Sequence, residues 1–344
     1  MQNVGRRPVN RHESDSAAQP AVDWRWADAM RSIVFFAGVY LYLWLWVQPC
    51  LIYSCATITD FPVFYKGWSF FASSVQSPGG LTRYVSAFAS QLFFHSWAGA
   101  AVVVVLAWAI AACTGCLLRA VRLSGTRLLR FVPAIFVFVA FARYSFHLPL
   151  FTGALVSLAF ACVYVKLADR SRAVGIWLVL SLVLYVVAGP AFLPFAGLCV
   201  AYELGRRRWR RVGAYLSVAA VLPYVVGVLV FRIGLVNAYT DLLPISWRVA
   251  GWPTRERMIA AVYVVYLFAL AGTLLAALGH ALFTRWRNRQ GSDKSRPGRL
   301  VRVVRRPVIQ WSFGTLVLFA AGAGSAVCSL DGEQKAMLAV HHYS

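Results

Sequence analysis

The charged side chains best suited to chemistry lie in or beside two long segments between apolar runs. Segment 55–94 contains Asp60, and segment 232–257 opens with an arginine. A carboxylate can remove the proton of an acceptor hydroxyl, and guanidinium groups can hold a phosphate as it leaves. The sequence therefore predicts a candidate site in which Asp60 is the catalytic base. Its candidate lipid-phosphate ligands are Arg83, Arg143 and Arg232.

Other reactive motifs are weak or absent in the sequence. Cys113 and Cys116 form a C-x-x-C, but the surrounding run AWAIAACTGCLL is typical of a membrane helix and not of a redox motif at a strand-to-helix turn. His341 and His342 are adjacent and do not have a metal-ligand spacing. The sequence has no glycine-rich phosphate loop, G-x-S-x-G elbow or H-E-x-x-H motif. We therefore expect no metal and no cofactor.

The elements that position these side chains are predicted to be membrane helices. Of 344 residues, 60% are apolar and 13% are charged, with a mean hydropathy of +0.64, whereas a soluble domain has about 25% charged residues. Because backbone polar groups in lipid must be satisfied within the chain, the expected fold class is all-α, a polytopic transmembrane helical bundle. Crossing ~30 Å of hydrocarbon takes ~20 residues. This predicts nine spans, at 32–54, 95–118, 130–147, 149–167, 173–189, 191–205, 212–231, 258–283 and 308–329.

The region 173–205 is open to two interpretations, because its two apolar runs are short and meet at Pro190. They form either two full spans or one re-entrant hairpin, and both leave the N-terminus and the C-terminus on opposite sides.

The basic residues predict the orientation of the bundle. The net charge is +22 at pH 7, and 26 of the 34 Lys and Arg residues fall on one side when alternate loops lie on opposite sides. Because Lys and Arg are retained in the cytoplasm, this pattern predicts a multi-pass protein of a bacterial inner membrane, with the bilayer as its partner and no nucleic acid. The predicted divisions are a basic cytoplasmic tail (1–31), the bundle (32–329) with a basic cytoplasmic loop (284–307), and an extracytoplasmic segment (330–344).

The first outer segment also contains an amphipathic pattern. Its apolar residues recur at helical spacing, which predicts a helix lying in the membrane interface. The apolar face carries Leu81, Tyr84, Val85, Phe88 and Leu92. The polar face carries Thr82, Ser86, Ser90 and Gln91.

The stretch PGGLTRYVSAFASQLFFHSWAGA resembles a motif in an uncharacterised family of bacterial multi-pass proteins, domain-of-unknown-function family 6057. The residues that carry the resemblance are Pro78, Gly79, Gly80, Leu81, Tyr84, Phe88, Gln91, Phe93, Phe94, Trp97 and Gly99. The resemblance implies a multi-pass membrane fold and supplies no reaction. Family members continue past the last span into an extracytoplasmic helical region, which implies that Ser344 is a truncation or frame boundary.

Three classes of function fit these observations. The layout is similar to that of membrane glycosyltransferases that use a polyprenyl-phosphate sugar, in which a catalytic Asp follows the first span, although Asp60 lacks the paired acid of many such enzymes. A non-catalytic envelope scaffold is the alternative. A transporter ranks third, because it would need broken helices with charges at the membrane midplane and only Gly189-Pro190 offers a break. Glu203 and Asp169 are interpreted as ion-pair partners of neighbouring arginines.

Overall fold

The computed structural model describes residues 23–54, 62, 64–121, 127–142, 144, 148–243 and 263–274. These residues are helical with no strand among them, which confirms the predicted all-α class. In chain order the elements are α1 (Asp23–Tyr42), η1 (Leu43–Val47), α2 (Cys50–Ser54), α4 (Trp68–Val75), α5 (Gly80–Ser90), η2 (Gln91–Phe94), α6 (Ser96–Ala120), η3 (Arg127–Phe131), α7 (Val132–Phe141), α8 (Leu148–Leu167), α9 (Ala173–Ala188), η4 (Gly189–Ala191), α10 (Phe192–Gly205), α11 (Trp209–Leu222), η5 (Pro223–Val230) and α12 (Leu235–Thr240), followed by a helix over Tyr263–Leu274.

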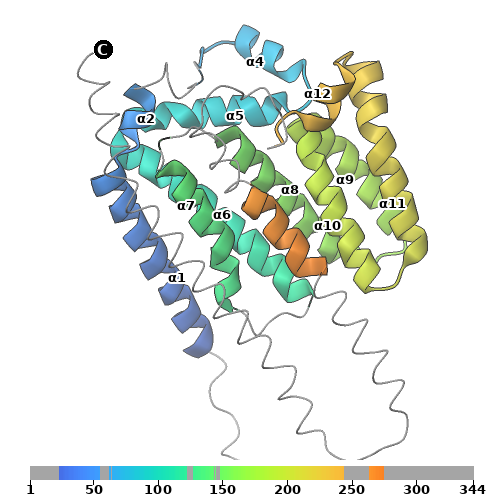
Figure 1. The fold of residues 1–344 in the computed structure, drawn as a ribbon, viewed down its shortest axis with the longest axis horizontal. Coiled ribbons are helices and arrows are strands. Elements are labelled where there is room, and N and C mark those ends of the chain that lie inside the picture. Colours follow the sequence, from blue (N-terminus) through green and yellow to red (C-terminus); the bar gives the residue numbers. More distant parts are fainter. Residues whose placement is uncertain are drawn as a thin grey trace, which may run out of the picture.

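The long helices run between two ends of one bundle, and α5 lies across one of these ends (Figure 1). We call it the α5 end, and it includes the η4 turn and α12. The opposite end is called the arginine end. It contains the loop 168–172 between α8 and α9 and the loop 206–208 between α10 and α11.

Long-range hydrogen bonds fix the direction of the first helices. At the α5 end, the hydroxyl of Tyr144 donates to the carbonyl of Val47 over 2.7 Å. At the arginine end, Nη2 of Arg130 donates to the hydroxyl of Ser32, also over 2.7 Å. Helices α1 and α7 therefore run in the same direction, from the arginine end to the α5 end.

Helices α9 and α10 form an antiparallel hairpin with its turn at the α5 end. Helix α9 begins just after Asp169, and Arg206, which directly follows α10, pairs with that carboxylate. The turn η4 joins the two helices and is fully buried. Both helices therefore run between the two ends of the bundle, 16 residues in α9 and 14 in α10.

Within the part of the chain that the structure describes, five stretches are helical, long and apolar enough to cross a membrane, as expected of a membrane protein. They are Ala29–Val47, Ser96–Ala120, Leu148–Leu167, Ala173–Gly205 and Trp209–Val230. Two shorter apolar helices cover Leu129–Phe141 and Tyr263–Leu274. The predicted span 308–329 lies outside the described residues, as do parts of 130–147 and 258–283. The count of nine spans stays a prediction.

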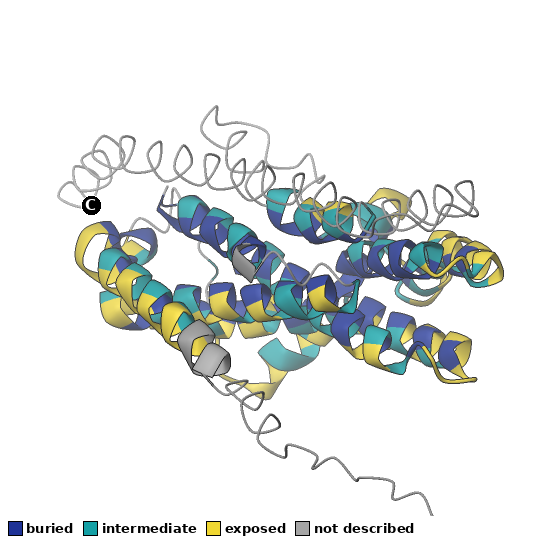
Figure 2. Ribbon diagram, turned by 90° about the horizontal axis from the view of Figure 1, so that it is seen from below, coloured by how far each residue is buried: buried dark blue, intermediate teal, exposed yellow. Residues whose placement is uncertain are grey.

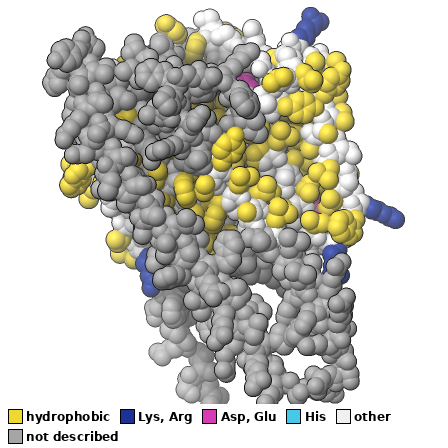
Figure 3. Space-filling model, viewed as in Figure 1, with side chains coloured by type: hydrophobic (Ala, Val, Ile, Leu, Met, Phe, Trp, Pro, Cys, Tyr) yellow, Lys and Arg dark blue, Asp and Glu magenta, His cyan; other side chains and the backbone are white. Residues whose placement is uncertain are grey.

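The surface of these helices is largely apolar. Buried residues occupy the inward side of each long helix and exposed residues the outward side (Figure 2). On the face seen in Figure 3, hydrophobic side chains cover much of the described surface, and the visible Lys and Arg side chains lie toward its margins. Such a belt is costly in water and favourable in lipid.

Helix α5 is present where the spacing predicts it, but its polar side chains turn inward. Thr82, Ser86 and Ser90 are buried, while Val85 and Phe88 are exposed. The hydroxyls of Ser86 and Ser90 donate to carbonyls of their own helix, over 2.7 Å each. This face of small polar side chains packs against α8 and α9. The location of α5 in a membrane interface stays a prediction.

Candidate functional site

The α5 end is joined to the α9–α10 hairpin by bonds from the Pro78-Gly79-Gly80 turn. The amide of Gly79 donates to the carbonyl of Val186 over 3.0 Å, and the hydroxyl of Thr82 donates to the carbonyl of Val187 over 2.8 Å. The last carbonyls of a helix have no partner within the helix. These two bonds therefore satisfy the end of α9 and anchor α5 to it.

The close approach of the two turns requires glycine. Gly79 has φ +80° and Gly189 has φ +56°, both in the left-handed region. A Cβ on Gly79 would lie 3.2 Å from the carbonyl carbon of Ala188 and 2.5 Å from Cδ1 of Leu242. A Cβ on Gly189 would lie 3.1 Å from the carbonyl oxygen of Pro78. The Pro-Gly-Gly turn thus lets two backbones meet.

An ion pair and a buried tyrosine attach α12 to this junction. Arg83 on α5 pairs with Asp241, the residue after α12, and both side chains are partly exposed. The hydroxyl of Tyr185 on α9 is buried and donates to the carbonyl of Ala238 in α12 over 3.0 Å. We call this assembly of α5, η4 and α12 the outer junction.

The structure describes two of the four residues of the predicted catalytic site, so the gathering of all four stays a prediction. Asp60 and Arg143 lie outside the described residues. Arg83 contacts Asp241, and no described contact joins it to Arg232. Arg83, which the sequence predicts to bind the lipid phosphate, therefore already has a carboxylate partner, Asp241.

Arg232 is exposed just beyond the end of η5. Its φ of +54° is in the left-handed region, and the amide of Ile233 donates to the carbonyl of Gly227 over 3.1 Å. A left-handed residue commonly terminates a helix, and a cation there is favoured by the helix dipole. The conformation of Arg232 is thus explained by helix termination.

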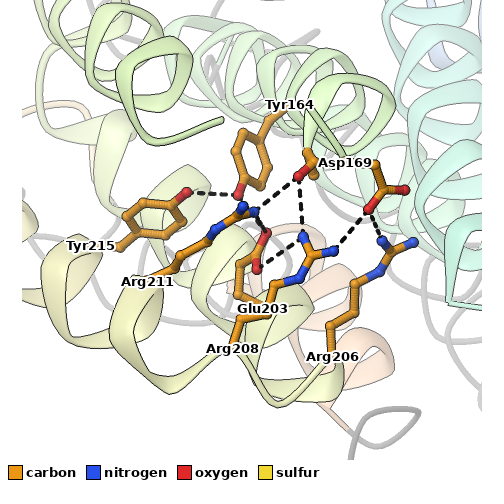
Figure 4. A network of polar contacts seen from close by, with 8 residues as sticks. Tyr164, Asp169, Glu203, Arg206, Arg208, Arg211 and Tyr215 are labelled. Carbon is orange, nitrogen blue, oxygen red and sulfur yellow. Dashed lines mark hydrogen bonds and ion pairs between the residues drawn. The ribbon is translucent and has the colours of Figure 1, made fainter. Parts of the chain in front are cut away.

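The arginine end holds a buried carboxylate, Glu203, within a group of polar side chains (Figure 4). The hydroxyl of Tyr164 donates to Oε1 of Glu203 over 2.6 Å, and the hydroxyls of Tyr164 and Tyr215 lie 2.8 Å apart. Nη1 of Arg208 lies 3.6 Å from Oε2, and Nη1 of Arg211 lies 3.6 Å from Oε1. We call these five residues the Glu203 cluster; it joins α8, α10 and α11.

A second set of bonds ties the same arginines to the α8–α9 loop. Arg206 and Arg208 both pair with Asp169, over 3.0 Å for Arg208. Arg208 and Arg211 also donate to the carbonyl of Ala168, over 3.1 and 3.0 Å. The hydrogen bond from Arg208, aided by the charge of Arg206, holds the pKa of the Asp169 carboxyl below its ordinary value. We call these contacts the Asp169 clasp.

Comparison with known proteins places the chain among proteins of one family. A family model described as "Family of unknown function (DUF6057)" matches residues 23–343. The chain belongs to this family. The DUF6057 match includes all described residues and contains the Pro-Gly-Gly turn. No curated protein and no solved structure matches the chain. Membership of DUF6057 supplies no reaction.

In this DUF6057 chain Glu203 forms the expected ion pairs, and its partners are Arg208 and Arg211. Sequence reasoning missed Tyr164 and Tyr215, which complete the cluster. Their signal was a phenolic hydroxyl inside each of two apolar runs, because a buried tyrosine hydroxyl usually finds a partner. The stacking of Trp177 on Tyr215, with ring centroids 4.1 Å apart, was not readable from sequence.

The C-x-x-C residues of the DUF6057 chain lie at a helix contact. Cys113 and Cys116 are on α6, which packs against α8, and the thiol of Cys162 donates to the carbonyl of Cys113 over 3.3 Å. Within the described ranges, no group of three His, Cys, Asp or Glu side chains could hold a metal ion.

Proposed function

We propose that this chain is a multi-pass protein of a bacterial inner membrane whose working surface is the outer junction. The arginine end lies in the cytoplasm in this arrangement, because basic loops are retained there. What supports the proposal is the separation of the two ends: the arginine loops are at one, and the α5–η4–α12 assembly is at the other.

Topology can be measured directly with single cysteines in a variant that lacks the natural seven. An exposed position at the α5 end, Val236→Cys, should react with a membrane-impermeant maleimide added to intact cells. An exposed position at the arginine end, Arg210→Cys, should react only after the membrane is opened. The reverse result would overturn the proposed orientation.

The activity we propose for the outer junction is transfer of a sugar from a polyprenyl phosphate. Asp60 would take the proton of the acceptor hydroxyl, and Arg143 and Arg232 would hold the leaving phosphate. The observation that carries this assignment is the exposed guanidinium of Arg232, which pairs with no described carboxylate. Arg83 is reassigned from phosphate ligand to positioning residue, because Asp241 already neutralises it.

The transferase proposal is tested with Asp60→Asn and Arg232→Gln in membranes supplied with polyprenyl-phosphate sugars. Both variants should abolish transfer while insertion and expression are kept. Lys66→Gln is a matched control in the same segment as Asp60, and it should retain transfer. Wild-type levels of transfer in Asp60→Asn would remove the catalytic role of this carboxylate.

A non-catalytic scaffold of the envelope is the second candidate, and a specific observation favours it. Asp169, Glu203 and Asp241 are the carboxylates whose side chains the structure describes, and each one is paired with arginine. None of them is free to act as a base. A scaffold predicts that Asp60→Asn keeps full function in cells, whereas exposed substitutions on α12 disrupt it.

A transporter has less support. The break at Gly189-Pro190 lies in the turn between two helices and packs against Pro78, instead of interrupting one helix between the two ends of the bundle. Discontinuous helices near the midplane are the usual sites of substrate binding in transporters.

A further inference from the structure

We propose that the arginine end binds the phosphate groups of anionic phospholipids through Arg170 and Arg172 on the α8–α9 loop and Arg210 on α11. The proposal rests on the membrane placement given above but not on any transferase activity. It assigns a ligand to cations that the Glu203 cluster and the Asp169 clasp do not use.

The charge balance at this end leaves a cationic surplus. Loops and helix ends from Lys166 to Arg211 hold eight basic residues against the two acids Asp169 and Glu203. In the described ion pairs, these two acids pair with Arg206, Arg208 and Arg211. Arg170, Arg172 and Arg210 are exposed and pair with no described carboxylate.

The clasp brings this surplus to one place. Arg208 and Arg211 donate to the carbonyl of Ala168, which holds the start of α11 against the loop that carries Arg170 and Arg172. Two short basic loops from different hairpins are therefore fixed beside each other. Guanidinium groups bind phosphate oxygens through paired hydrogen bonds, so a fixed group of arginines suits a phosphate ligand.

The two helices that begin here add to the attraction for an anion. Helix α9 starts at Ala173 and α11 at Trp209, with no acidic residue in the first turn of either and no side-chain cap. The positive end of the helix dipole favours negative charge at such positions.

Membrane lipid is the source of phosphate that fits this surface best. Trp209 stands between Arg208 and Arg210 with 66% of its surface exposed, and tryptophan is enriched at the level of the lipid headgroups. Helices α9 and α11, which begin at these arginines, belong to stretches apolar enough to cross a membrane. Basic pockets between membrane helices on the cytoplasmic side are a known type of phospholipid headgroup site.

Trp209 provides a local readout for the test. The full chain is reconstituted into nanodiscs that contain phosphatidylglycerol and phosphatidylcholine, with bromine on the acyl chains of one or the other. The difference in fluorescence between the wild type and Trp209→Phe isolates the signal of Trp209. Brominated phosphatidylglycerol should quench this signal at a lower mole fraction than brominated phosphatidylcholine does, and salt should reduce the preference.

The variant Arg170→Gln/Arg172→Gln/Arg210→Gln should lose the preference for phosphatidylglycerol, by about fivefold for each arginine removed. The matched control is Arg6→Gln/Arg7→Gln/Arg11→Gln, which removes the same charge elsewhere and should keep it. Arg210→Gln alone should lose about fivefold, which provides a test should the triple variant not fold.

Each outcome decides a separate question. Equal quenching by the two lipids in the wild type would overturn the headgroup site but keep the membrane placement. Absence of quenching by either lipid would overturn the placement of the arginine end at a leaflet. A preference that survives in the triple variant would assign phosphatidylglycerol binding to other residues, against the proposal.

Discussion

Gly79 and Gly189 lie against each other at the α5 end, so that a Cβ on Gly79 would sit 3.2 Å from the nitrogen of Gly189. A Cβ on Gly189 would in turn sit 3.4 Å from the Cα of Gly79. Two turns that are far apart in sequence, one before α5 and one between α9 and α10, are thereby in backbone contact. The outer junction depends on this contact, because the bonds from Gly79 and Thr82 to α9 require it.

Gly79→Ala should destabilise the protein by about 1–2 kcal/mol or more, since an L-residue in the left-handed region costs about that much before any clash is counted. Gly175→Ala is the matched control, because nothing lies within 4 Å of a Cβ there. Gly175 lies in the first turn of α9, so this change should stay within about 0.5 kcal/mol of the wild type. Thermal unfolding in detergent compares the two, and equal stability would contradict the backbone contact.

Glu203→Gln should lower stability by about 1.5–3 kcal/mol, the range for a hydrogen bond to a charged group. The amide keeps the shape of the carboxylate and removes the charge that faces Arg208 and Arg211. Chemical unfolding in mixed micelles measures the loss. Ser217→Ala serves as control, because its exposed hydroxyl bonds only to its own helix, and it should stay within about 0.5 kcal/mol of wild type.

Tyr164→Phe tests whether the Glu203 cluster acts as a unit. The change removes the donor to Oε1 of Glu203 and the contact with the hydroxyl of Tyr215. In a double-mutant cycle with Glu203→Gln, the two losses should differ from their sum by about 0.5–3 kcal/mol. Simple additivity would show that tyrosine and carboxylate contribute independently.

The sequence predicts where the helices lie along the chain better than it predicts how they pack against one another. The spacing of Leu81, Tyr84 and Phe88 predicts a helix in this segment, and α5 covers Gly80–Ser90, but the spacing does not predict its inward polar face. That face is buried because Ser86 and Ser90 bond to carbonyls of their own helix and leave a small surface for α8. Hydrophobic spacing alone cannot distinguish polar groups satisfied within a helix from polar groups that need water.

Tertiary structure also determines which arginine an acidic residue pairs with. Asp169 is adjacent in sequence to Arg170 but pairs with Arg206 and Arg208. The α9–α10 hairpin brings the end of α10 back to the start of α9, and this return sets the pairing. Neighbouring charges on a chain predict that an acid is neutralised, not which arginine reaches it.

The stability contributed by Asp169 should depend on acid pH. Its pKa is lower in the folded protein, chiefly through Arg208, so the contribution is full above the unfolded value of about 3.9. It is lost as pH falls through the folded pKa. Melting curves of wild type and Asp169→Asn should therefore differ at pH 7 and converge below about pH 4. A constant difference across this range would contradict the pairing with arginine.

The Arg83–Asp241 ion pair should limit the access of a protease to the chain just before α12. Because both side chains are partly exposed, the pair contributes about 0.2–1 kcal/mol, enough to change local opening without unfolding the bundle. Arg83→Asp should speed tryptic cleavage after the exposed Arg232, identified by fragment mass. The exchange Arg83→Asp/Asp241→Arg restores opposite charges and should return cleavage after Arg232 toward the wild-type rate. Cleavage that stays fast in the exchanged protein would show that Arg83 holds α12 through contacts other than this ion pair.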